Sequence, residues 1–268
     1  MEFFLKESQS TALHREEKRM FKKVGDKIKE KKLDYYINKA KGKDQLLDKE
    51  KYLTKALGLI EENQGVFEQK TINSTRTWLK NTTNQIREIK NEIKTQIPII
   101  EEKMKTQKAF EEVKAGLGNL KQKANLVGDP QLIDLLNQVQ VKKDFNENLY
   151  RIMEECRQLF SQEDYRQAVD KLSSTFISIK NNPNLGYPDL IEPLKGMRQT
   201  IQKIMLEKRE EFLDFLNEKE TELKNKRNFL EIQDMVKARL EDFKKLGFTD
   251  LVDRINLLYK TALFNERT

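Results

Sequence analysis

A twelve-residue motif occurs three times between residues 128 and 258, and no other feature constrains the fold of this chain as strongly. The copies begin at Gly128, Gly186 and Gly247, which places them 58 and 61 residues apart. All three share the glycine, apolar residues at the fourth, fifth, eighth and eleventh positions after it, and an acidic residue at the sixth. Repeats of tens of residues are typical of stacked supersecondary units. The motif therefore predicts a row of similar units.

Each copy of the motif has the features of a junction between two helices. The glycine follows an apolar residue and suits the left-handed conformation that ends many helices. Asp129 is a good N-cap ahead of Pro130, Pro188 suits a helix start, and Thr249 can cap the third copy. The apolar residues that follow lie on one face of the new helix. The sequence thus predicts a left-handed glycine and a buried helical face in each copy.

Hydrophobic periodicity places helices on both sides of the junctions. Short helices are expected at residues 51–62, 110–125, 165–180 and 229–245, and long ones at 131–160 and 190–223. A further long helix has apolar residues seven apart from Ile72 to Ile100, which is typical of a coiled-coil seam. Thr75 and Thr82 weaken that seam, and Pro98 predicts a kink. Either another part of the chain or a second copy can cover it, so an oligomer is possible.

These patterns predict an all-α fold, an elongated, α-solenoid-like array of antiparallel helical hairpins in which short and long helices alternate. The array is expected to occupy residues 46–268, behind a basic N-terminal helical arm at residues 1–45. Only 10 Gly and 5 Pro are present, too few for the turns of a sheet protein. The alternative architecture is a bundle, or coiled coil, of antiparallel long helices.

Residues 153–183 resemble a degenerate tetratricopeptide unit. The resemblance rests on the small residue Cys156 in a first helix, on the run Asp-Tyr-x-x-Ala from Asp164 to Ala168 that opens a second, and on Pro183 beyond it. The tryptophan and glycine of the family's first helix are absent, Pro183 is displaced, and the spacing differs from the usual repeat of about 34 residues. Repeats of that family form a concave surface for peptides or partner helices, and the resemblance implies such a surface here.

Positive charge is concentrated near the N-terminus, although the whole chain carries only +7. Between residues 18 and 32, eight cations stand against Asp26 and Glu30, which gives a local charge of +6. The candidate residues for binding an anionic partner are Lys18, Arg19, Lys22, Lys23, Lys27, Lys29, Lys31 and Lys32. A narrow apolar stripe (Phe21, Val24, Ile28 and Tyr35) follows the same helix, and Phe3, Phe4 and Leu5 can add a small hydrophobic anchor.

The basic segment has several possible roles. It can be a solvated helix whose apolar stripe packs on the rest of the fold. It can instead lie on an anionic membrane or bind an acidic protein. Nucleic acid is the least favoured partner because the segment lacks interleaved exposed aromatics and a recognised docking motif.

Residues with catalytic or metal-binding chemistry are scarce. One cysteine and one histidine exclude a disulfide framework and Cys- or His-rich zinc sites. His14 has the neighbourhood of a surface residue, and Cys156 is expected to be a small buried hydrophobe. No phosphate-binding loop, dinucleotide fingerprint or calcium loop is present. We therefore expect no enzymatic activity, no cofactor and no metal.

The expected function is that of a non-catalytic scaffold or adaptor that binds other proteins through helical repeats. The alternative is a membrane-associated coiled-coil protein that binds anionic lipid through its basic helix and polymerises, similar in outline to membrane-remodelling filament subunits. The N-terminus lacks the apolar core of a signal peptide, and no stretch approaches a spanning helix, so the expected location is cytoplasmic.

Overall fold

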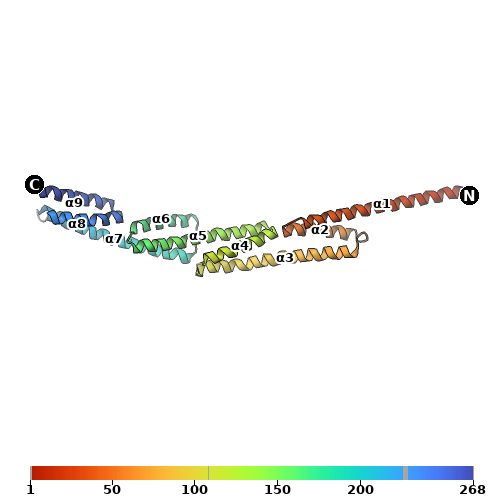
Figure 1. Cartoon of the computed structure of the whole chain (residues 1–268), viewed down its shortest axis with the longest axis horizontal. Helices are drawn as coiled ribbons and strands as arrows, with labels where there is room; N and C mark the ends of the chain where they lie inside the picture. Colours follow the sequence, from red (N-terminus) through yellow and green to blue (C-terminus); the bar gives the residue numbers. More distant parts are fainter. Residues whose placement is uncertain (1, 108, 226–228, 268) are drawn as a thin grey trace. The chain divides into compact units, whose positions relative to one another are not determined.

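The computed structural model describes residues 2–107, 109–225 and 229–267, and within these ranges the fold is all-α, with no strand. Antiparallel helical hairpins follow one another along the chain (Figure 1), which confirms the predicted fold class. The α-helices are α1 (Glu2–Lys41), α2 (Leu46–Glu62), α3 (Gln69–Glu102), α4 (Phe110–Val127), α5 (Pro130–Ser161), α6 (Tyr165–Asn181), α7 (Pro188–Lys224), α8 (Phe229–Leu246) and α9 (Thr249–Arg267), with a π-helical turn, η1 (Lys103–Gln107), after α3.

Long and short helices alternate from α1 to α8, as the periodicity predicted. The starts and ends of α4 to α8 lie within two residues of the predicted bounds, whereas α2 begins five residues earlier, at Leu46. Local caps explain two of the starts. The Asp129 carboxylate accepts a hydrogen bond from the Gln131 N–H (3.0 Å) ahead of Pro130, and Asp164 accepts one from the Gln167 N–H at the start of α6.

The glycine prediction holds for two of the three motif copies. Gly128 and Gly247 have positive φ angles of 76° and 74° and end α4 and α8. Gly186 is not left-handed: it lies in the loop between α6 and α7, where a Cβ atom would come within 2.8 Å of Ile191 Cδ1 and 3.3 Å of Phe145 Cε1. Glycine allows close packing there and does not serve a left-handed turn, so that part of the prediction was wrong. Thr249 is the first residue of α9, so it does not flank that helix as a cap.

The chain forms two compact units, and the boundary between them falls within α5. The first unit contains the chain up to Glu102 and Glu111–Gln140; the second contains Lys103–Phe110 and the chain from Val141 onward. This division differs from the boundary predicted at residue 45.

In the first unit, α2 packs against α1 and α3. A cluster of buried residues joins these helices: Leu33, Ala56, Leu59, Ile60 and Ile72, with Tyr36, Ile37 and Phe67 partly buried beside it. The α3 seam is buried within the chain, including Ile86 and Ile93. Thr75 and Thr82 are buried in it too, and their hydroxyls donate to the carbonyls of Thr71 and Trp78 one turn earlier. The polar seam positions are thereby satisfied within α3.

In the second unit, α7 packs against α6, α8 and α9, and α8 packs against α9. Phe212 of α7 stacks on the fully buried Phe243 of α8, with ring centroids 4.0 Å apart. Cys156 is buried where α5 meets α6, 4.0 Å from the Ala168 carbonyl, which confirms its predicted place in the core. Burial raises the pKa of the Cys156 thiol.

Candidate binding site on the N-terminal helix

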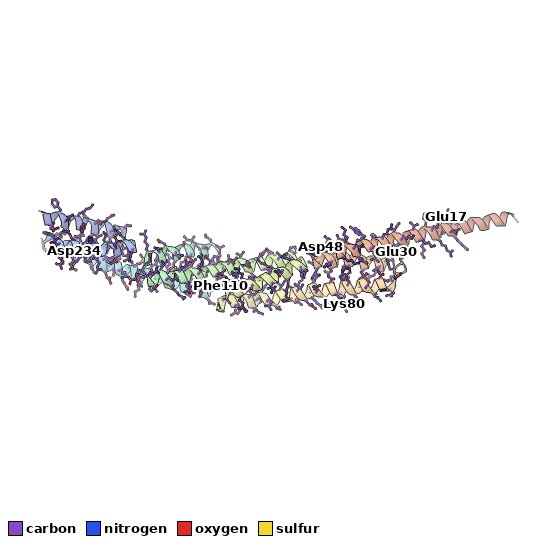
Figure 2. All side chains as sticks on the ribbon, viewed as in Figure 1. Glu17, Glu30, Asp48, Lys80, Phe110 and Asp234 are labelled. Atoms are coloured by element: carbon purple, nitrogen blue, oxygen red, sulfur yellow. The ribbon has the colours of Figure 1, made fainter. Side chains whose placement is uncertain are left out.

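All eight candidate cations lie on α1, in the stretch from residue 18 to residue 32, which we call the basic segment. Seven of their side chains are exposed, and Lys29 is half-buried. In Figure 1, α2 and α3 lie alongside only the C-terminal part of α1, and in Figure 2 the side chains between the labelled Glu17 and Glu30 surround a helix that has no neighbour on most of that stretch. The side chains of Phe3, Phe4 and Leu5, predicted as an anchor, lie outside the described residues.

The apolar stripe of this segment is also exposed. The exposed fraction is 77% for Phe21, 56% for Val24 and 61% for Ile28, and Met20, which the sequence analysis missed, is 61% exposed. Tyr35 is exposed as well, with its ring 5.6 Å from Lys39 Nζ. The interpretation that the stripe packs on the rest of the fold is therefore wrong.

Helix geometry explains this exposure. The core contacts of α1 come from Leu33 and Ala40, which are buried, together with the partly buried Tyr36 and Ile37. At about 100° per residue, Val24, nine residues before Leu33, faces about 180° away from it. The apolar stripe and the core-facing side of α1 are therefore opposite sides of one helix. Met20 shares the stripe by the i, i+4 spacing to Val24, a signal that could have identified it.

Charge on the basic segment is only weakly compensated. Lys29 lies 3.6 Å from Asp26, and among the described residues the structure gives the other seven cations no carboxylate within ion-pair distance. Such a single, partly exposed pair contributes little to stability and leaves the field of the cluster largely intact. The two acids of the segment, Asp26 and Glu30, lie on the side of the helix away from the stripe. The segment thus presents apolar and cationic side chains together.

Elsewhere, the described residues form no surface with a comparable excess of charge beside exposed apolar side chains. A shallow cavity of about 390 Å³ lies where the turn between α5 and α6 meets α7 and α8. Its lining contains three cations (Lys208, Arg239 and Lys245) and three acids (Glu163, Glu211 and Asp242), so the lining carries no net charge. Over the described ranges, no group of three or more His, Cys, Asp or Glu side chains is placed to hold a metal ion. His14 is exposed, with Nδ1 3.8 Å from the Glu17 carboxylate.

Comparison with known protein families, curated proteins and solved structures finds no match to this chain. None of the helices, as far as the structure describes them, combines the length and the apolar character needed to cross a bilayer. The candidate site therefore rests on the geometry and charge of α1 alone.

Proposed function

We propose that this protein is a non-catalytic interaction scaffold, and that the basic segment of α1 is its main docking element. The observation that carries the proposal is the exposure of Phe21, Val24 and Ile28 on a helix whose other end is held in a core. Large apolar side chains in a row mark an interaction surface more often than a solvated face.

The hairpins behind the docking element supply a stable support. Leu33 and Ala40 fix the C-terminal part of α1 against α2, so the basic segment continues a helix that is already formed. A preformed helix pays little conformational entropy on binding. The repeat, and the concave protein-binding surface that the tetratricopeptide resemblance of residues 153–183 implies, belong to the same proposal as a second mode of protein contact.

Capture of partners by three versions of the full chain tests this function. The first is the natural sequence, and the second carries Phe21→Gln, Val24→Gln and Ile28→Gln. Glutamine has good helix propensity, so α1 should stay helical. The third is a matched control with Ile177→Gln, Leu206→Gln and Leu257→Gln, which changes side chains of similar exposure (63%, 62% and 66%) on α6, α7 and α9.

Partners are captured from a whole-cell extract that retains its membranes, and circular dichroism confirms equal helicity. The proposal expects the stripe variant to lose partners that the natural sequence and the control both retain. Equal capture by all three versions would show that the docking element lies elsewhere.

A further inference from the structure

We infer that the partner of the basic segment is an anionic lipid membrane, on whose surface the segment lies with its apolar stripe facing the acyl chains. This inference rests on the proposed function and names the class of partner for the same site. The observation behind it is that an exposed apolar stripe and a local charge of +6 occupy one preformed helix.

The arrangement around the helix matches what an interfacial helix requires. At about 100° per residue, Met20, Phe21, Val24 and Ile28 fall within an arc of about 100°. Lys27 borders this arc on one side and Lys32 on the other, and both are exposed. Lysines at the margins of such a stripe bury their methylene stems and extend their ammonium groups to lipid phosphates.

The fold also leaves room for a flat surface to reach the stripe. The side of α1 that packs on α2 is the side of Leu33, about 180° from Val24. A membrane that contacts the stripe therefore approaches α1 from the side opposite α2. Leu33 and Ala40 hold α1 against α2, and the stripe is already exposed in this arrangement. Binding through the stripe therefore requires no core contact to break.

Charge and shape disfavour three other partners for the basic segment: a second copy of the chain, nucleic acid and an acidic protein. A second copy of α1 would bring a charge of +6 against another +6, and like charges at that density repel. Nucleic acid would neutralise the cations through its phosphates but leave Phe21 and Ile28 in water. An acidic protein would need a groove that fits the stripe, whereas a bilayer supplies apolar depth and anionic charge without a matching shape.

Flotation of the full chain with lipid vesicles tests the inference. The vesicles contain phosphatidylcholine with about 30% phosphatidylserine, and vesicles of phosphatidylcholine alone are the reference. Binding should be strong only to the anionic vesicles and should largely disappear in about 0.5 M salt, where charges are screened over a few ångströms.

A charge variant and a matched control separate this site from general electrostatic attraction. The variant carries Lys23→Glu, Lys27→Glu, Lys31→Glu and Lys32→Glu, the exposed lysines nearest the stripe by helix geometry, and the control carries Lys114→Glu, Lys195→Glu, Lys203→Glu and Lys244→Glu. Both change the net charge from +7 to −1, but the lysines of the control lie on α4, α7 and α8. Each lysine near an anionic surface contributes about a fivefold change in binding, so removing four should weaken it by several hundredfold. The control should bind within about tenfold of the natural sequence, since its lysines lie far along the chain from the segment.

The stripe variant Phe21→Gln, Val24→Gln, Ile28→Gln tests whether the apolar face enters the bilayer. We expect it to bind the anionic vesicles at least tenfold more weakly than the natural sequence, although its charge is unchanged. Equal binding by this variant would overturn the inference, because the segment would then be held by charge alone.

Capture from an extract cleared of membranes separates the failure of this inference from the failure of the proposed function. If the vesicles fail to bind while protein capture depends on the stripe, the partner is a protein and the membrane inference is wrong. If neither vesicles nor proteins depend on the stripe, both the inference and the proposed function are wrong.

Discussion

Replacing Asn146 by alanine should destabilise the second unit by about 2–4 kcal/mol. Asn146 is fully buried on α5 and holds the loop between α6 and α7. Its Nδ2 donates to the carbonyls of Lys142 and Leu185 (2.7 Å each), and its Oδ1 accepts from the N–H of Tyr187 (2.8 Å). The variant loses the bond to the Leu185 carbonyl, worth about 1 kcal/mol, and leaves the buried Tyr187 N–H without its acceptor, which costs about 1–3 kcal/mol.

Two measurements check this magnitude. Urea unfolding followed by circular dichroism gives the free energy of unfolding, and hydrogen exchange gives the local protection of the Tyr187 amide. Since about 1.4 kcal/mol is a factor of ten, that amide should exchange at least tenfold faster in Asn146→Ala if local opening controls exchange.

Asn148→Ala is the matched control because Asn148 lies on the same helix but is exposed, and its side chain accepts only from Arg151 (2.7 Å). Both variants gain the same helix propensity, so any difference between them reports the loop contacts. The control should change stability by less than about 0.5 kcal/mol. The reasoning would be refuted if Asn146→Ala were no less stable than Asn148→Ala and the Tyr187 amide exchanged at the natural rate.

Three further predictions can be checked, the first two by urea unfolding and the third by reaction of the cysteine with a thiol reagent. Gly128→Ala should lower the free energy of unfolding by about 1–2 kcal/mol, because φ is 76° there and the new Cβ would lie 2.7 Å from the Gln45 side chain. Gly196→Ala, where nothing lies within 4 Å of the new Cβ, should raise it by about 0.5–1 kcal/mol. Lys90 Nζ donates to the Asp129 carboxylate (2.6 Å) and holds the pKa of that carboxyl below the ordinary 3.8. The difference in free energy of unfolding between the natural sequence and Asp129→Asn should therefore be constant above about pH 5 and vanish as the pH falls through the depressed pKa. Cys156 should react with a thiol reagent only as fast as the unit opens, since the thiol is buried and its raised pKa keeps it protonated; rapid labelling of the folded protein would contradict this.

The sequence predicted helices well because their signals are local. Hydrophobic spacing, Asp129 ahead of Pro130 and the Asp164 cap each act within one or two turns, so helix bounds follow from neighbouring residues. The motif copy at Gly186 was misjudged for the opposite reason. This glycine packs beside Phe145, about forty residues earlier in the sequence, and that proximity exists only after the loop between α6 and α7 has packed on α5.

The candidate site shows the same division. The sequence identified its cations and most of its apolar stripe, since both are periodic along one helix. It left open whether the stripe is covered, because Phe21 and Val24 look as hydrophobic as Leu33 when read alone. Covering a side chain requires a second helix, and only the packing of α2 on α1 decides which face that helix occupies.

Taken by itself, the sequence determined the all-α class, the alternation of long and short helices, and the accumulation of charge on one segment, because periodicity and composition are properties of neighbouring residues. The tertiary structure alone decided that the α3 seam is buried within the chain, that Gly186 lies close against Ile191 and Phe145, and that the stripe of α1 is exposed. These outcomes depend on contacts between residues far apart in the sequence, and such contacts are set by how the helices pack together.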